Sequence, residues 1–430
     1  MAQQLNGYMN NMQAVILAAG KSTRFYPYNQ TLEHKSLFSL LGKPILEHTL
    51  LSLKRAGIAE IIIIVGEQES VIEKLFGNGE RLGIHITYRY HEGAKGGGAA
   101  LLEAKDILTG SFLLINAYHI DVDEFIPDLL KKNTGQNVVL LGQKVDTASE
   151  SGFAQVAGDK VLSVIEKPKT ISQESLKIVG MYLLPKEFLA ILEKTPLSHY
   201  HLEEALDSFA KNNDVQIVQT NKKSITLKYV TDLFALKDYL LSKITTHISP
   251  NAIVSKTAQI IGAVIVEDGA EIMEQAVIKG PCFIGRNTKI GTMAILRSGV
   301  VVEENVVIGA RLEAKNTIFA KNVTTHNGFI GDSIVGENTK IAGSIITANA
   351  RLDRQPVSIF VKEEKVNTGI RHVGAIFGES DNIGVQVSTM PGVIVGNDVV
   401  VGPATTVMKN IPDNKKYFTK FAETVEENNG

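Results

Sequence analysis

Cysteine, net charge and long apolar segments are all scarce in this sequence of 430 residues. Its one cysteine, Cys282, excludes a fold held by disulfide bonds and favours a reducing compartment. The 44 basic and 46 acidic side chains give a formal net charge of −2, which offers no argument for binding nucleic acid or a membrane. No apolar run is long enough to span a membrane, and the polar first residues lack the features of a secretion signal. The sequence therefore predicts a cytoplasmic protein.

A repeat of six residues organises the second half of the chain. Every sixth residue from Val254 to Ile308 is a branched aliphatic, and the residue two places before each is nearly always small. The aliphatic positions are Val254, Ile260, Val266, Ile272, Ile278, Ile284, Ile290, Leu296, Val302 and Ile308. Neither an α-helix nor a half-buried strand has this period. Six residues form one side of a triangular coil with its aliphatics inside, so the repeat predicts a parallel β-helix.

The repeat is interrupted twice after Ile308. Its period is lost between residues 312 and 325, where we expect a loop or bulge. It is lost again over the hydrophilic residues 349–369, where we expect a loop that leaves the coil. Hexads with a glycine return at Phe377-Gly378, and they continue to Val401-Gly402. Cys282 occupies a small interior position of the repeat, which favours a packing role for its thiol.

The first half alternates apolar strands with helical segments. Residues 14–17 form an apolar run that leads to Gly20, and a basic loop containing Lys21 and Arg24 follows. A strand, a glycine turn and a basic loop are typical of a phosphate-binding site, because backbone N–H groups and a cation face the anion. Further apolar runs separated by amphipathic segments predict an α/β domain with a mostly parallel sheet.

Several motifs give this order of domains a family resemblance. The segment Leu17-Ala18-Ala19-Gly20 is followed by Thr23, Arg24 and Pro27, and later by His34-Lys35 and Gly42-Lys43-Pro44. Glu166-Lys167-Pro168 and Gly180-Met181-Tyr182 follow in order. The chain resembles the sugar-1-phosphate nucleotidylyltransferase family, and especially its bifunctional members. These join an N-acetylglucosamine-1-phosphate uridylyltransferase to a glucosamine-1-phosphate acetyltransferase. The resemblance implies a Rossmann-like nucleotidyltransferase domain followed by a left-handed parallel β-helix.

The resemblance implies a set of ligand-binding residues in the first domain. The nucleoside triphosphate would be bound by Leu17, Ala19, Gly20, His91, Gly96 and Gly97. Arg24 and Lys35 would neutralise its phosphates, and Glu166, Lys167 and Gly180 would bind the sugar 1-phosphate. In-line attack by a sugar phosphate depends mostly on positioning and charge stabilisation, which suits such a set.

The positions of the two metal-binding aspartates differ from the family pattern. Tyr118 stands where the family has the first aspartate, and Tyr229 stands where it has the second. A neutral phenol does not replace a carboxylate as a ligand of Mg²⁺. Asp121 and Asp123 are near enough in sequence to be considered as substitutes. We therefore predict slow or absent nucleotidyl transfer.

The β-helix also carries residues in the order of the acetyltransferase. The resemblance assigns His326 as the base that accepts the proton of the attacking amine, a role that suits the pKa of histidine. Arg297, Lys315 and Asn349 would bind the amino-sugar phosphate, and Ser388 and Ala404 would bind acetyl-CoA. Phe329 and Lys340 replace a tyrosine and an asparagine of the family.

These expectations combine into one domain plan and two functions. The plan is a disordered tail (1–12), a nucleotidyltransferase-like domain (13–230), a helical linker (231–249), an acyltransferase-like β-helix (250–411) and a C-terminal tail (412–430). The leading function is a homotrimeric enzyme of amino-sugar nucleotide biosynthesis, of the UDP-N-acetylglucosamine type. It would use a sugar 1-phosphate, a nucleoside triphosphate and acetyl-CoA. The alternative is a non-catalytic regulatory subunit that binds a nucleotide or sugar phosphate.

Overall fold

The computed structural model describes residues 12–427, except residues 69, 93–95, 146–150 and 223. These residues form two compact units. The first contains the chain up to Ser22, Glu33–Phe38 and Pro44–Thr226, and the second contains Thr23–Leu32, Ser39–Lys43 and the chain from Leu227. Two short segments inside the predicted first domain therefore belong with the second unit. The predicted tail 1–12 lies outside the described residues, apart from Met12.

The first unit is a sheet of nine strands in the order β5-β4-β1-β6-β10-β7-β11-β9-β8. Pairs on both sides of β1 are parallel, whereas β10 runs antiparallel to its neighbours β6 and β7. The strands are β1 (Gln13–Leu17), β4 (Glu60–Val65), β5 (His85–Tyr90), β6 (Phe112–Asn116), β7 (Val138–Gln143), β8 (Gly152–Ala157), β9 (Lys160–Glu166), β10 (Ser175–Leu184) and β11 (Val215–Thr220).

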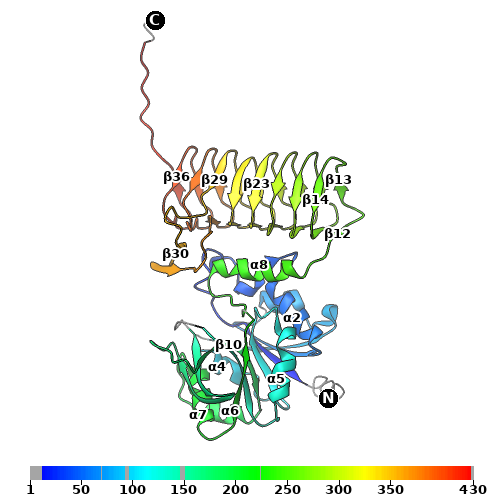
Figure 1. The fold of residues 1–430 in the computed structure, drawn as a ribbon, viewed down its shortest axis with the longest axis vertical. Helices are drawn as coiled ribbons and strands as arrows, with labels where there is room; N and C mark the ends of the chain where they lie inside the picture. The colour runs from blue at the N-terminus through cyan, green and yellow to red at the C-terminus, as the bar shows by residue number, and fades with distance from the viewer. Residues whose placement is uncertain (1–11, 69, 93–95, 146–150, 223, 428–430) are drawn as a thin grey trace. The chain divides into compact units, whose positions relative to one another are not determined.

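Helices cover both faces of this sheet (Figure 1). One apolar cluster joins the sheet to α2 (Ile45–Arg55), α3 (Val71–Phe76) and α5 (Ile126–Lys132). A second cluster joins it to α4 (Gly96–Leu102), α6 (Phe188–Lys194) and α7 (His201–Ala210). Neighbouring residues of β1 alternate between the clusters, since Ile16 belongs to the first and Val15 to the second. This is the packing expected for a strand buried on both faces. Short 3-10 helices are η2 (Lys35–Leu37), η3 (Glu80–Leu82) and η4 (Val122–Glu124).

The second unit is a left-handed parallel β-helix whose three sides are three parallel sheets. The first side contains β12 (His247–Ile248), β15 (Val264–Val266), β18 (Cys282–Ile284), β21 (Val301–Val302), β24 (Ile318–Phe319), β27 (Ile334–Val335) and β32 (Ile376–Phe377). The second contains β13 (Ile253–Val254), β16 (Glu271–Ile272), β19 (Lys289–Ile290), β22 (Val307–Ile308), β25 (Thr324–Thr325), β28 (Lys340–Ile341), β33 (Asn382–Ile383), β35 (Val400–Val401) and β37 (Lys416–Tyr417). The third contains β14 (Gln259–Ile261), β17 (Val277–Lys279), β20 (Ile295–Leu296), β23 (Leu312–Lys315), β26 (Gly328–Gly331), β29 (Ile345–Thr347), β34 (Ser388–Thr389) and β36 (Thr406–Val407).

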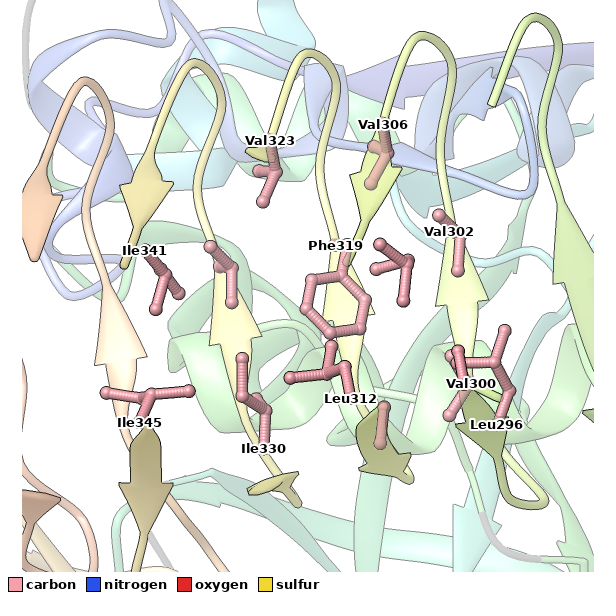
Figure 2. Close-up of a cluster of buried hydrophobic side chains, with 14 of the residues drawn as sticks. Leu296, Val300, Val302, Val306, Leu312, Phe319, Val323, Ile330, Ile341 and Ile345 are labelled. Atoms are coloured by element: carbon pink, nitrogen blue, oxygen red, sulfur yellow. The ribbon is translucent and has the colours of Figure 1, made fainter. Parts of the chain in front are cut away.

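The interior of the β-helix is the aliphatic column that the six-residue period predicts. Figure 2 shows Leu296, Val302 and their counterparts in later coils pointing into it, with the ring of Phe319 among them. Cys282 is fully buried in the same column, as its small position in the repeat predicts. The predicted fold class is confirmed for both parts of the chain.

The expected loop at residues 312–325 is not present, because the coil continues through it. β23, β24 and β25 all pair in parallel with the strands of the preceding coil. Val301 pairs with Ile318 and Ile318 with Ile334, so these coils are one and two residues shorter than the preceding one, in which Phe283 pairs with Val301. The shortened turns hide the six-residue period without interrupting the sheets.

The predicted departure at residues 349–369 is present as a hairpin. β30 (Ser358–Val361) pairs antiparallel with β31 (Glu364–Asn367), and the coil resumes at β32. At the two ends of the domain the coil extends beyond the predicted 250–411, since β12 pairs with β15 and β37 pairs with β35. The second unit also contains η1 (Tyr28–Gln30), β2 (Ser39–Leu40), η5 (Val230–Asp232) and α8 (Leu233–Ser242), and β3 (Lys43–Pro44) spans the boundary between the units. None of the described helices is long and apolar enough to cross a membrane.

Candidate functional site

The carboxyl ends of β1 and β6 lie side by side in the first unit, because Leu17 pairs with Asn116 in a parallel register. β1 pairs with β4 along its other edge, so the order of strands along the chain reverses at β1. In open α/β sheets, ligands bind outside the carboxyl ends of strands at such a point. Gly20, which is exposed, follows β1, and Tyr118 follows β6. The sequence motif thus stands where this topology favours a ligand.

Lys35 contacts this edge of the sheet from η2. Its backbone N–H donates to Ser22 Oγ at 3.1 Å, and its Nζ lies 4.9 Å from the centre of the Tyr118 ring. His34 Nδ1 accepts from Ser36 N–H at 3.3 Å and so caps η2. Burial, followed by the charge of Lys35, lowers the pKa of His34 to about 3, so its ring is neutral. Lys35 therefore lies over an aromatic ring, in a cation–π contact.

The described residues near the end of β6 do not fit a Mg²⁺ ion. Asp123 accepts from Arg55 Nε at 2.8 Å and from Ser52 Oγ at 2.5 Å. Burial alone would raise the pKa of Asp123, but these hydrogen bonds outweigh it and lower the pKa. Asp121 is 2% exposed, and its Oδ1 lies 3.8 Å from His119 Nδ1. Tyr229, the other replaced position, is the N-cap residue that precedes η5 in the second unit, and its N–H donates to Asp232 Oδ2 at 2.9 Å. Among the described residues, no group of three or more His, Cys, Asp or Glu is placed to hold a metal.

The residues predicted to bind the sugar 1-phosphate come from the end of β9 and from the middle of β10. Lys167 Nζ lies 5.8 Å from the centre of the Tyr200 ring. Gly180 has a φ of 81°, and a Cβ there would lie 3.0 Å from Asn116 Nδ2, so glycine is required on both counts. A Cβ on Gly152 would lie 2.9 Å from Glu166 Oε2 and 3.7 Å from Glu203 Cγ, which places these two acidic side chains around one glycine.

Two residues near the predicted sugar-phosphate residues, Glu203 and Tyr182, were not predicted as site residues from the sequence. Burial raises the pKa of the Glu203 carboxyl. Tyr182 is buried, and burial, with the neighbouring charges of Glu203 and Glu166 and with Tyr118, raises the pKa of its phenol well above 10. Tyr182 was part of the Gly-x-Tyr motif, so its position carried a signal. Glu203 lies on the amphipathic helix α7, where nothing local distinguishes it from a surface acid.

The glycines at the start of α4 allow close packing. A Cβ on Gly97 would lie 3.1 Å from Leu17 Cδ1, so these two predicted nucleotide-binding residues are neighbours. A Cβ on Gly96 would lie 2.7 Å from the His199 carbonyl. Ala19 follows β1, and its carbonyl lies 3.5 Å from the position of a Cβ on Gly66.

Two further residues predicted to bind the triphosphate are His91 and Arg24. His91 is 7% exposed, and its Nδ1 lies 3.1 Å from Glu103 Oε1, so its ring faces a carboxylate within the protein. Arg24 belongs to the segment Thr23–Leu32 of the second unit.

In the β-helix, Lys315 and Asn349 meet at one buried carboxylate. Asp332 is 3% exposed and accepts from Asn349 Nδ2 at 2.6 Å, Asn316 Nδ2 at 2.8 Å and Lys315 Nζ at 3.3 Å. Lys237 of α8 is fully buried and donates to Asn316 Oδ1 at 2.8 Å and to Asp238. A hollow of about 530 Å³ lies beside this network, lined by Lys315, Asn316 and Asp332 and by residues of α8. Lys237 is the member that sequence reasoning missed, because a lysine on a helix normally faces solvent.

His326 lies in a different hollow of the same domain. His326 is exposed and lines a hollow of about 370 Å³, which Lys340, Ile341, Asn382 and Val401 also line. Neither Lys315 nor Asn349 lines it. Arg297 pairs with Glu313 at 3.0 Å on the third side of the β-helix.

The predicted acetyl-CoA residues lie on neighbouring coils. Ser388 N–H donates to the Thr405 carbonyl at 3.1 Å, and Ala404 precedes that residue with a φ of 50°. Ser388 and Ala404 therefore lie close together within a single chain.

Comparison with known proteins decides the family. The family model described as nucleotidyl transferase matches residues 13–242, which is more than half of the chain. The chain belongs to the nucleotidyl transferase family. It is 32% identical over 420 residues to the bifunctional protein GlmU of Methanococcus vannielii, covering 95% of this chain and 98% of that protein. It is 30% identical to the bifunctional protein GlmU of Methanocaldococcus jannaschii, covering 94% and 96%.

A more distant relative carries a descriptive name. The bifunctional sugar-1-phosphate nucleotidylyltransferase/acetyltransferase of Sulfurisphaera tokodaii is 28% identical, covering 93% of this chain and 98% of that protein. The similarity of this GlmU-like chain to its relatives therefore extends over both units. The resemblance predicted from the motifs is confirmed.

Proposed function

We propose that this GlmU-like chain transfers an acetyl group from acetyl-CoA to the amine of an amino-sugar phosphate at its β-helix. In its first domain it binds a nucleoside triphosphate and a sugar 1-phosphate, and it transfers nucleotidyl groups slowly or not at all. The proposal places the chain in the synthesis of an amino-sugar nucleotide of the UDP-N-acetylglucosamine type. The names of its relatives support both activities in principle.

The observation that carries the acetyl-transfer proposal is that His326 is exposed and lines a hollow. An amine attacks a thioester only as the neutral base, so the ammonium form must first lose a proton. His326 accepts that proton, and the neutral amine nitrogen bonds to the acetyl carbon. As the carbon–sulfur bond breaks, the nitrogen loses a second proton, which the leaving coenzyme A thiolate takes up to give the free thiol. A base within reach of the amine contributes about two to four orders of magnitude to such a rate.

The β-helix also supplies polar groups for the two substrates. Arg297 and Lys315 would bind the phosphate of the sugar, and Asn349 would orient its amino group. Ser388 and Ala404, on adjacent coils, would bind acetyl-CoA.

Because Lys315 lines one hollow and His326 lines another, one chain does not gather these two residues in a single hollow. We therefore propose a homotrimer in which a neighbouring copy completes the site. A monomeric mass by light scattering at micromolar concentration would contradict this arrangement.

In the first domain, Lys35 and Gly20 stand at the carboxyl ends of β6 and β1, where a triphosphate would bind. Arg24 and Lys35 would neutralise its phosphates, while Glu166, Lys167 and Gly180 would bind the sugar phosphate. Tyr118 provides no anionic ligand for Mg²⁺, and Asp123 is already held by Arg55 and Ser52. These two observations support a domain that binds its ligands but transfers nucleotidyl groups slowly or not at all.

A second candidate function follows from the same observation. A domain that binds nucleotide and sugar phosphate without efficient chemistry suits a regulatory subunit. Such a subunit would need neither His326 nor a completed acetyl site.

One assay distinguishes the two functions. Purified chain is incubated with acetyl-CoA and glucosamine 1-phosphate, and release of the free thiol is measured. His326→Ala is compared with His247→Ala, a matched control that removes an exposed histidine from the first coil. We expect His326→Ala to lower turnover by about two to four orders of magnitude, with acetyl-CoA affinity unchanged. His247→Ala should behave as the wild type. Thiol release that is absent from the wild type over a panel of amino-sugar phosphates would favour the regulatory subunit.

A further inference from the structure

A segment of the nucleotide-binding motif packs on the last coils of the β-helix, within the second unit. The motif begins in the first unit with Leu17–Gly20, but residues Thr23–Leu32, which include Arg24, belong to the second unit. Several hydrogen bonds join this segment to residues more than 340 positions away in the sequence. Nothing in the acetyl-transfer chemistry requires these contacts.

Tyr28 is the central anchor of this segment. It is fully buried, and its hydroxyl donates to the Phe377 carbonyl at 2.8 Å. Its ring lies 2.9 Å from the position that a Cβ on Gly336 would occupy, so the coil at that point is shaped to receive the ring. The Phe377 carbonyl also accepts from the Gly336 N–H at 3.0 Å, so the coil has its own hydrogen bond there without Tyr28.

Asn397 and Asp413 hold the segment from the following coils. Asn397 Nδ2 donates to the Pro27 carbonyl at 2.9 Å, while its Oδ1 accepts from Glu379 N–H at 2.9 Å. The Tyr26 hydroxyl donates to Asp413 Oδ1 at 3.0 Å. Residues 26, 27 and 28 are therefore each bonded to a different part of the last coils.

A second anchor lies further along the chain. Gly42, in the segment Ser39–Lys43, donates its N–H to Glu303 Oε2 at 3.0 Å. Glu303 is a fully buried side chain of the β-helix. Gly42 has a φ of 76°, and a Cβ there would lie 3.3 Å from the ring of Phe283, so the backbone approaches the coil closely.

We propose that the last coils of the β-helix position the segment that carries Arg24, with Tyr28 and Asn397 as positioning residues for triphosphate binding. The inference rests on the proposed nucleotide-binding function of the first domain. Its physical basis is that a cation contributes to anion binding only when its backbone is held at the correct place, and small displacements lose most of the effect.

The test uses full-length chain and two variants, each of which removes one hydrogen bond between the segment and the coils. Tyr28→Phe keeps the ring and removes the hydroxyl, and Asn397→Ala removes the donor to Pro27. The matched control is Asn410→Ala, because Asn410 Oδ1 accepts from Ile394 N–H at 2.9 Å and its Nδ2 donates to the Phe360 carbonyl of the hairpin at 2.9 Å. The control thus removes the same pair of bonds from the same region without touching the segment.

Two readouts are measured for each protein. Hydrogen exchange of the peptide covering residues 23–32 reports on the segment itself, and calorimetric titration with UTP reports on binding. We expect faster exchange and about fivefold weaker binding in Tyr28→Phe and in Asn397→Ala, the usual worth of one hydrogen bond. Asn410→Ala should match the wild type in both readouts.

Different failures have different meanings. Unchanged exchange in both variants would overturn the proposal, because the coils would then not hold the segment. Faster exchange with unchanged UTP affinity would also overturn it, because Arg24 would not depend on the anchors. No UTP binding by the wild type, with dTTP and ATP also failing, would overturn the proposed nucleotide function and this role with it.

Discussion

Lys35 in the first unit and Lys315 in the β-helix were both predicted to bind phosphate, and their surroundings differ. Lys35 Nζ lies 4.9 Å from the ring centre of Tyr118, a neutral group. Lys315 Nζ lies 3.3 Å from the buried carboxylate of Asp332, which also accepts from Asn316 and Asn349. The ring of Tyr118 carries no charge, whereas the carboxylate of Asp332 compensates the charge of Lys315.

The difference shows that the group in contact with a lysine determines how readily the lysine can bind a phosphate. A buried carboxylate that lost its donors would carry an unbalanced charge, so the Asp332 network holds the coils together as well as facing a hollow. A lysine over a ring is attracted more weakly, and an incoming phosphate competes with the ring more easily than with a carboxylate. The following predictions test this contrast, from the largest expected effect to the smallest.

Removing Asp332 should have the largest effect. Asp332→Ala leaves Lys315, Asn316 and Asn349 without their shared acceptor. The free energy of unfolding of the β-helix should fall by about 3 kcal/mol, as is usual when one partner of a buried network is removed. The measurement is denaturant unfolding followed by circular dichroism.

The control for this variant is Asp353→Ala. Asp353 pairs with Arg351 at an exposed site of the β-helix, where an ion pair contributes little. We expect its unfolding midpoint to match that of the wild type. Equal midpoints for Asp332→Ala and Asp353→Ala would mean that the buried network has no structural role.

Local sequence patterns predicted most of the architecture. The six-residue period predicted the β-helix, because each hexad is one side of a coil and its aliphatic residue enters the core. Alternating apolar runs and glycine turns predicted the sheet of the first unit. The period could not reveal that the coil continues from Leu312 to Thr325, because a turn that loses one residue shifts every later position.

The remaining features depend on contacts between distant residues. Tyr28 donates to the Phe377 carbonyl, and Lys237 donates to Asn316, and neither pair forms a local pattern. The motifs named Leu17 and Gly97, which are neighbours in the structure, and they named Lys315 and Asn349. They could not show that Asp332 joins the last two, or that the residues after Ser22 pack with the β-helix.

Replacing Tyr118 and Tyr229 by aspartates should produce an intermediate effect. In Tyr118→Asp combined with Tyr229→Asp, carboxylates replace both phenols at the positions of the family's metal ligands. With added Mg²⁺, the rate of pyrophosphate release from UTP and a sugar 1-phosphate should rise tenfold or more, since about 1.4 kcal/mol of charge stabilisation gives that factor.

The matched control replaces the same tyrosines by asparagine, which has the shape of aspartate without its charge. The asparagine pair should stay at the wild-type rate. A wild type that already releases pyrophosphate rapidly would show that other groups bind the metal, and the assignment of Tyr118 would then be wrong.

A comparison of two buried carboxyl groups, Asp381 and Asp332, predicts how stability depends on pH. Asp381 is fully buried, and its Oδ1 accepts from Val399 N–H at 2.8 Å, while its Oδ2 has no hydrogen-bond partner. Burial raises the pKa of Asp381 to about 8, backbone hydrogen bonds oppose the shift, and the charges of Asp398 and Asp413 add to it. Asp332, which has Lys315 and two amides as donors, is the matched case with a cation.

The smallest expected effect is the pH dependence that Asp381 gives to stability. Between its ordinary pKa of 3.8 and the folded value of about 8, the folded chain keeps a proton that the unfolded chain has lost. Unfolding therefore releases a proton, so the stability from this group is greatest at low pH and falls as the pH rises to about 8. Asp381→Asn keeps an acceptor for Val399 and removes the titration. The melting temperature of the wild type relative to Asp381→Asn should fall by about 2–4 °C between pH 7.5 and pH 9, which corresponds to about 1 kcal/mol in a domain of this size. A difference that is constant over this range would show that Asp381 is ionised in the folded protein despite its burial.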